Sequence, residues 1–196
     1  MLLKNQKEKE DKLLDSAYEL FTKKGINDTS IKEIADSAGI GKGTFYLYFK
    51  NKYDLEEQLI ARKSNKLFNK ALKELNKEEI KKFDDQIIFI IDYVIEKLKK
   101  NKLLLKLIAK NLSYGIYNSN LNQKVEQELG IRNMFLKGIE EHNIKLSNPE
   151  VTLFMIIELT SSTCFSCILN KKPIAIDEYK PYLYNTIKKM LNEKNL

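Results

Sequence analysis

Residues 30–53, SIKEIADSAGIGKGTFYLYFKNKY, constrain the fold of this chain more than any other stretch. Ser30 is followed three residues later by Glu33, a capping-box spacing that starts a helix. Gly39 predicts the end of that helix, because glycine adopts the left-handed conformation of the C′ position without steric cost. A second short helix is expected over about residues 41–49. The stretch therefore predicts a helix-turn-helix unit, two short helices joined by a tight turn.

The second helix of such a unit enters the major groove of DNA, so its outward residues are candidates for DNA contact. Phe45 and Phe49, four residues apart, share one face and are expected to pack inward. Elsewhere, lysines would neutralise phosphates, and hydroxyls would bond phosphates or base edges. Gly43 would let the backbone approach DNA closely. The predicted DNA-binding residues are Thr29, Ser30, Lys42, Gly43, Thr44, Tyr46, Tyr48 and Lys52.

The net charge of +7 does not by itself indicate a nucleic-acid partner, because of where the charge lies. Residues 1–55 contain ten lysines against nine acidic residues, so the excess is downstream. The DNA-binding prediction depends instead on the local cluster of Lys42, Lys50 and Lys52. The alternative is a small helical hairpin whose exposed polar residues bind no DNA.

Two runs of sequence resemble a known family. GIGKGTFYLYFKNKYDL resembles the recognition-helix signature of the TetR/AcrR family of transcriptional regulators, and AYELFTKKGINDTSIKEIADSAG is similar to its first two helices. The match covers about residues 10–62; beyond it the resemblance is only architectural. Gly41 departs from the pattern, since many members carry Ser or Thr there, and one polar contact is lost. The resemblance implies an effector-binding C-terminal domain and a four-helix dimer interface.

The sequence contains no recognisable catalytic arrangement: neither a nucleophile–base pair, nor paired inward carboxylates, nor a phosphate-binding loop. Cys164 and Cys167 have a CxxC spacing, but zinc would need two further ligands, and the only histidine, His142, is distant and expected to be solvated. Buried core or interface cysteines are favoured, with a redox switch as the alternative. We therefore expect no enzymatic activity, no cofactor and no metal.

The location expected by default is cytoplasmic. The first residues, MLLKNQKEKEDK, are too charged for a signal peptide. No uninterrupted apolar run approaches the roughly 18 residues that a membrane span needs, so no membrane association is expected.

Apolar periodicity predicts an all-α fold of about nine helices. Apart from the helix-turn-helix (about residues 30–49), helices are expected over residues 10–24, 52–76, 83–99, 103–112, 119–142, 149–169 and 177–193, with residues 1–9 frayed. The expected domains are residues 1–50, a three-helix DNA-binding head, and residues 51–196, a helical bundle for ligand binding and dimerisation. Lys52, at the start of the fourth helix, is expected to reach a backbone phosphate.

The C-terminal bundle contains two helices too apolar for a single buried face. The helix over residues 83–99 is apolar all round at its centre, which predicts a core position. Aromatic side chains nearby are interpreted mostly as core, with some lining an apolar ligand cavity, mainly because the resemblance implies an effector. The candidate pocket residues are Phe89, Tyr93, Ile108, Tyr114, Tyr117, Phe135 and Phe154.

The helix over residues 149–169 is equally apolar and rich in small residues, and a monomer of this length would hardly bury both its faces. A two-fold dimer, in which this helix and residues 177–193 pair with their copies, is the simplest solution. The candidate interface residues are Met155, Leu159, Ser162, Phe165, Ser166, Leu169, Tyr182, Ile187 and Met190.

Together these features predict a homodimeric transcriptional regulator that binds a double-stranded, pseudo-palindromic operator. The favoured interpretation is a repressor released by a small apolar effector. Two alternatives stay open. One is a DNA-binding regulator whose second domain answers to a protein partner or to nothing; the other is a helical interaction module that binds no DNA.

Overall fold

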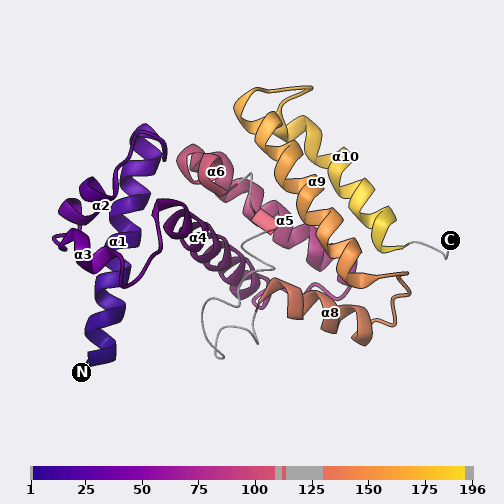
Figure 1. The fold of residues 1–196 in the computed structure, drawn as a ribbon. Helices are drawn as coiled ribbons and strands as arrows, with labels where there is room; N and C mark the ends of the chain where they lie inside the picture. Colours follow the sequence, from indigo (N-terminus) through magenta and orange to yellow (C-terminus); the bar gives the residue numbers. More distant parts are fainter. Residues whose placement is uncertain (1, 109–111, 114–129, 193–196) are drawn as a thin grey trace. The chain divides into compact units, whose positions relative to one another are not determined.

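The computed structural model describes residues 2–108, 112–113 and 130–192 of the chain (Figure 1). Within these residues all regular secondary structure is helical and forms nine labelled helices. They are α1 (Leu2–Lys24), α2 (Ile31–Ser37), α3 (Lys42–Phe45), α4 (Lys52–Leu75), α5 (Phe83–Lys100), α6 (Lys102–Ile108), α8 (Ile131–Glu141), α9 (Pro149–Leu169) and α10 (Ile176–Leu191). The all-α fold of about nine helices is confirmed. Of the helix expected over residues 119–142, the part over residues 119–129 lies outside the described residues, and the rest corresponds to α8.

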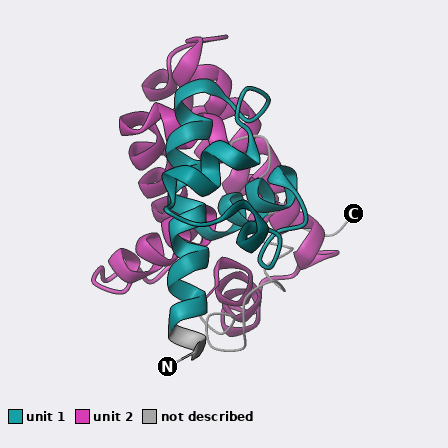
Figure 2. Ribbon diagram, turned by 60° about the vertical axis from the view of Figure 1, so that its left-hand side comes forward, with its two compact units in different colours: residues 1–62 teal, residues 63–196 magenta. Residues whose placement is uncertain are grey.

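The chain divides into two compact units, residues 1–62 and 63–196 (Figure 2). The boundary lies inside α4, whereas the sequence suggested a boundary before this helix, at residue 50. The first turns of α4 belong to the N-terminal unit because they are fastened to it. Leu55 and Leu59 are fully buried, and the Arg62 guanidinium lies 2.5 Å from the carboxylate of Asp11 in α1.

α1 begins at Leu2, whereas the apolar pattern alone predicts a start near residue 10. Residues 5–9 of the additional turns are polar and exposed, and lysine and glutamate are good helix formers. Lys12 pairs with Glu8 at 3.0 Å one turn away, which stabilises a helix without any burial. Fraying of the first nine residues is therefore the wrong expectation: their helix needs no apolar face.

α5 forms the centre of the C-terminal unit and packs against α6, α9 and α10. Its buried side chains include Ile87, Ile90 and Val94, and no residue from Phe83 to Glu96 is fully exposed. The all-round apolar centre of this helix thus correctly predicts its central position.

The outer edge of the contact between α5 and α10 is ionic. The Lys180 ammonium, 15% exposed, lies 2.6 Å from the carboxylates of both Asp92 and Glu96. The Tyr184 hydroxyl donates a hydrogen bond of 2.5 Å to Asp92. Burial alone would raise the pKa of Asp92, but the hydrogen bonds from Lys180 and Tyr184 outweigh it and lower that pKa. The partly buried ammonium is therefore paired, as a buried charge must be.

α9 has the bounds that its sequence predicts, Pro149–Leu169, with Asn148 as its cap. By length and composition alone this helix would cross a membrane, with a mean hydropathy of 1.7 over an 18-residue window. Half of that window is buried inside the protein, and Leu153, Ile156 and Ile157 belong to its core. α9 is therefore a core helix of the C-terminal unit.

Candidate DNA-binding surface, effector cavity and dimer surface

The capping box predicted at the start of α2 is present. The Ser30 hydroxyl accepts from the Glu33 amide at 3.2 Å, and the Glu33 carboxylate accepts from the Ser30 amide at 2.8 Å. Lys24 of α1 donates to the same carboxylate at 2.6 Å. These hydrogen bonds, from Lys24 first and then from Ser30, lower the pKa of Glu33 to about 2. The start of α2 is thereby fixed to the end of α1.

The turn after α2 is built by Gly39, whose φ of 66° is in the left-handed region. The Gly39 amide bonds the Asp36 carbonyl at 3.1 Å, and the Ile40 amide bonds the Ala35 carbonyl at 2.9 Å. This pair of bonds is the Schellman motif, which satisfies the last carbonyls of a helix. It redirects the chain into α3 and completes the helix-turn-helix.

α3 is shorter than the helix expected over residues 41–49. It ends at Phe45, and the amides of Leu47 and Tyr48 bond carbonyls three residues back, at 3.1 and 3.0 Å. This tighter bonding replaces the α-helical pattern in a segment rich in aromatic residues, which are modest helix formers. Phe45 and Phe49 are buried as expected, with ring centroids 5.5 Å apart. The side chains on the opposite side of this segment therefore face outward.

The predicted DNA-binding residues differ in exposure. Lys42, Gly43 and Tyr46 are exposed, while Thr44 and Tyr48 are half-buried. Ser30 is exposed, but its hydroxyl is engaged in the capping box. The structure therefore brings most of the predicted set onto the outer side of residues 42–48.

Thr29 and Lys52 do not fit the expectation. Thr29 is 1% exposed, and its hydroxyl donates to the Gly25 carbonyl at 2.7 Å, so its side chain is not available to DNA. The Lys52 ammonium donates to the carbonyls of Ile26, Asn27 and Thr29, at 2.8, 3.0 and 3.1 Å. An ammonium has three donors, and these bonds use all of them. Lys52 thus fastens α4 to the loop between α1 and α2, and in this arrangement its ammonium has no donor left for a phosphate.

Leu47 is exposed, although it is not among the DNA-binding residues predicted from the sequence. Its side chain is 80% exposed, the largest fraction among the exposed large hydrophobic residues described. Its position in the sequence could have predicted this exposure, because Leu47 lies between Tyr46 and Tyr48 and is flanked by Phe45 and Phe49, which face inward. A side chain between two inward phenylalanines must point outward, whatever its polarity.

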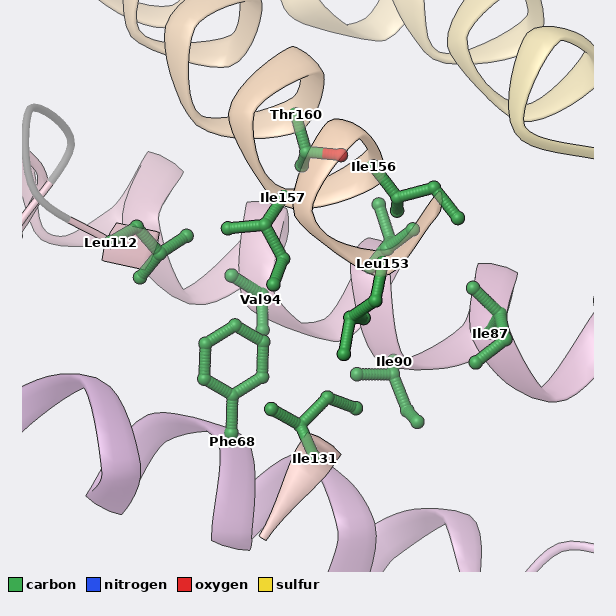
Figure 3. Close-up of a pocket in the computed structure, with 11 residues that line it drawn as sticks. Phe68, Ile87, Ile90, Val94, Leu112, Ile131, Leu153, Ile156, Ile157 and Thr160 are labelled. Carbon is green, nitrogen blue, oxygen red and sulfur yellow. The ribbon is translucent and has the colours of Figure 1, made fainter. Parts of the chain in front are cut away.

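The C-terminal unit contains an apolar cavity between α4, α5, α8 and α9. Figure 3 shows side chains of α9 pointing toward Phe68 of α4 and Ile131 of α8. The empty space among the lining residues, including the part open to solvent, is about 430 Å³. The lining residues are Phe68, Ile87, Ile90, Ile91, Val94, Leu112, Ile131, Leu153, Ile156, Ile157 and Thr160. Thr160 is the only polar member, and its buried hydroxyl oxygen has no hydrogen-bond partner among the described residues.

The predicted pocket residues mostly lie elsewhere. Ile108 lines a second, smaller cavity that also touches Thr160, whereas Tyr114 and Tyr117 lie outside the described residues. The other four line neither cavity. Phe135 packs in the core against Phe83, Phe154 is 46% exposed, and Phe89 and Tyr93 are half-buried on α5. Apart from Phe68, the described lining of the cavity is almost entirely aliphatic, so the aromatic residues chosen from the sequence were a poor guide to it.

Large apolar side chains are exposed along α9. Val151, Phe154 and Met155 have exposed fractions of 45 to 48%, and Tyr182 of α10 is 68% exposed. Of the predicted interface residues, Met155, Ser162 and Tyr182 are exposed, and Leu159, Phe165, Ser166, Leu169 and Met190 are half-buried. The prediction is wrong for Ile187, which is fully buried in its own unit. The apolar period of α10 could not distinguish its core side from an interface side.

The cysteines are free and buried, and burial raises the pKa of Cys164 to about 12. A thiol so protonated is a poor metal ligand or nucleophile. His142 is not merely solvated, because its ring nitrogens lie 3.0 and 3.2 Å from the carbonyls of Gly138 and Lys81. Among the described residues no group of three or more His, Cys, Asp or Glu is placed to hold a metal ion.

The N-terminal unit, with its capped helix-turn-helix and the exposed side of residues 42–48, has the features of a DNA-binding regulator, and the chain carries a separate helical unit besides it. The sequence profile of bacterial regulatory proteins of the tetR family matches residues 13–59, the heart of that unit. Residues 13–59 therefore form a DNA-binding domain of the TetR type, and the chain as a whole is similar to transcriptional regulators of the helix-turn-helix type. The resemblance of its helix-turn-helix to this family is thereby confirmed.

Curated relatives agree with this assignment, and solved structures share the fold. The helix-turn-helix-type regulator YhgD of Bacillus subtilis is 27% identical over 156 residues, which are 78% of this chain and 81% of YhgD. The regulator SAUSA300_2515 of Staphylococcus aureus is 26% identical over 93% of this chain and 94% of its own. A TetR-family regulator from Marinobacter aquaeolei superposes with a TM-score of 0.63 at 14% identity, covering 99% of this chain and 100% of its own. FadR from Bacillus subtilis, in complex with stearoyl-CoA, superposes with a TM-score of 0.62 at 19% identity, covering 92% and 96%.

Proposed function

We propose that this regulator is a homodimeric repressor that a small apolar effector releases from its operator. The observation that carries the proposal is the aliphatic cavity of the C-terminal unit. Ligand pockets are mostly apolar, with a few polar groups that orient the ligand, and Thr160 provides one such group. FadR, which shares the fold, has been determined with stearoyl-CoA, and this makes acyl-CoA thioesters the first effectors to test.

Release by an effector requires two states of the protein with different affinities for it. The state that holds the filled cavity must bind the operator less tightly than the empty state does. By linkage, operator DNA must then weaken effector binding by the same factor. This reciprocity distinguishes a true effector from an apolar compound that merely binds.

The second copy of the chain would cover the exposed apolar side of α9. Three large apolar side chains, Val151, Phe154 and Met155, share this helix at close to half exposure. Contiguous exposed apolar residues mark interaction sites in soluble proteins. A two-fold dimer would present two helix-turn-helix units to two half-sites of a pseudo-palindromic operator. Acting on DNA, the protein would work in the cytoplasm.

The effector proposal is tested with stearoyl-CoA, and with stearic acid and coenzyme A alone as comparison ligands. We expect stearoyl-CoA to raise the melting temperature and to weaken binding to DNA from upstream of the protein's own gene. A ligand at 100 times its Kd adds about 2.7 kcal/mol of stability, which a thermal-shift assay detects easily. If none of the three ligands binds or alters DNA affinity, the regulator answers to a protein partner or to another signal.

The dimer is tested by sedimentation at micromolar concentration. We expect the wild-type chain to be dimeric and Met155→Asp to be monomeric, because the substitution would bury an unpaired charge in the interface. Leu103→Asp is the matched control, since Leu103 of α6 is 49% exposed and Met155 is 45% exposed. A monomeric wild-type chain would contradict both the dimer and the two-half-site operator.

A further inference from the structure

Leu47 is an aliphatic side chain on a surface where polar contacts are expected. It is 80% exposed and follows the single turn of α3, opposite the buried Phe45 and Phe49. Its amide bonds the Thr44 carbonyl at 3.1 Å, so its backbone is held in place. An ordered aliphatic side chain left almost entirely in water gains nothing for the fold. Leu47 is therefore available to a binding partner.

Gly43, one turn before Leu47, gives an independent indication of the same partner. A Cβ built at Gly43 meets no atom within 4 Å, so packing does not require glycine there. Its φ is not in the left-handed region either, unlike those of Gly25 and Gly39. Glycine within a helix costs stability relative to alanine. Neither packing nor conformation therefore requires glycine at position 43, and the open space there leaves room for an external molecule.

We propose that Leu47 reads a thymine by packing against its 5-methyl group in the major groove, and that Gly43 provides the clearance for this approach. The inference requires only that the N-terminal unit binds DNA; it does not depend on an effector or on repression. In the major groove the thymine methyl is the apolar group, whereas the other base edges present hydrogen-bond donors and acceptors. An aliphatic side chain placed over those edges would leave them desolvated and unpaired. Leu47 thereby contributes sequence preference, whereas Lys42 contributes phosphate attraction.

The test removes the methyl group without altering any hydrogen bond. The probe is the duplex that the wild-type protein selects from a random pool, remade with each thymine of a half-site replaced by uracil. Removal of a buried methyl group costs a factor of about 4 in binding, or about 15 when both half-sites are changed. We expect the wild-type protein to show this loss at one thymine. Leu47→Ala should bind the original duplex more weakly and be indifferent to uracil at that position.

Two comparison variants make the result specific. Tyr46→Phe, at the adjacent exposed residue, should remain as sensitive to uracil as the wild type. Leu47→Val should also remain sensitive, but to a smaller extent. Gly43→Ala should melt at the same or a higher temperature than the wild type and yet lose operator affinity. Wild-type binding that no thymine-to-uracil change weakens would overturn the proposal. The proposal would also be overturned if uracil weakened the binding of Leu47→Ala as much as that of the wild type, or if the wild-type protein selected no duplex from the pool. A Gly43→Ala variant with full operator affinity would refute the role of Gly43.

Discussion

Replacement of Lys52 by alanine distinguishes a structural role of this lysine from a role in DNA binding. The Lys52 ammonium donates three hydrogen bonds to carbonyls of the loop between α1 and α2, all 3.1 Å or shorter. A hydrogen bond that involves a charged group is worth about 1.5–3 kcal/mol, but the three share one charge and one half-exposed side chain. We therefore expect Lys52→Ala to lose about 2 kcal/mol of stability in total. For a chain of this size that corresponds to a decrease in melting temperature of about 4–8 °C.

The same substitution should leave the salt dependence of operator binding unchanged. Each phosphate contact adds about 0.9 to the slope of log K against log salt, so a dimer that loses two contacts loses about 1.8. Lys52→Ala should bind DNA more weakly, because a loosened loop positions the helix-turn-helix less well, but with the wild-type slope. Lys42→Ala is the matched control: the exposed Lys42 starts α3, and its removal should lower the slope and preserve the melting temperature.

The two measurements are a thermal melt and an operator titration from low to high salt. Lys52→Met is a useful further variant, since methionine keeps most of the aliphatic length of lysine without its charge. The reasoning is refuted if Lys52→Ala melts like the wild type and lowers the salt slope as Lys42→Ala does. In that case the ammonium leaves the carbonyls of the loop when DNA binds, and Lys52 is a phosphate contact after all.

Three further outcomes follow from the structure. Gly138→Ala should destabilise the C-terminal unit by about 1–3 kcal/mol, because a Cβ at this position would lie 2.1 Å from the ring of the buried Phe83. Denaturant unfolding measures the effect, and an unchanged unfolding midpoint would contradict this packing. Thr160→Val should stabilise the effector-free protein by about 1 kcal/mol, because it removes a buried hydroxyl that has no partner in the described part of the chain. A lower melting temperature would mean that the hydroxyl is satisfied. Lys24 and Ser30 lower the pKa of Glu33 from 4.5 to about 2. The ionised carboxylate therefore contributes to folding stability above pH 4.5, and this contribution is lost as the pH falls toward 2. Glu33→Gln should therefore lose stability less steeply than the wild type over that interval, and parallel curves would disprove the coupling.

Features encoded within a single turn could be predicted from the sequence. The Ser30–Glu33 box and the Gly39 turn each depend on residues a few positions apart. Such signals specify helix ends whatever the tertiary context, and the bounds of α9 also agree with those expected from the sequence. The buried pair Phe45 and Phe49 followed from the same short spacing.

Features that depend on distant partners could not be predicted. Lys52 meets carbonyls 23 to 26 positions earlier in the chain, and no local pattern marks a carbonyl as an acceptor for a lysine. Ile187 has the spacing of an apolar stripe, but α10 has apolar residues on more than one side, and only packing decides which side is core. The cavity presented the same difficulty. Side chains such as Ile90 and Ile157 look like any core residue in sequence, and the space between them arises from how α5 and α9 are packed.

α4 is the physical basis for opposition between operator and effector under the proposed function. Among the described helices it alone has residues in both units. Its first residue, Lys52, holds the loop before the helix-turn-helix, and Phe68, farther along, lines the cavity. These residues are sixteen positions apart, or about 24 Å along an unbroken helix. Under the proposed function, a ligand that needs a different position of Phe68 would either move the first turn of α4 or strain the helix. The first outcome transmits the signal to the three carbonyls that Lys52 holds, and the second would reduce ligand affinity.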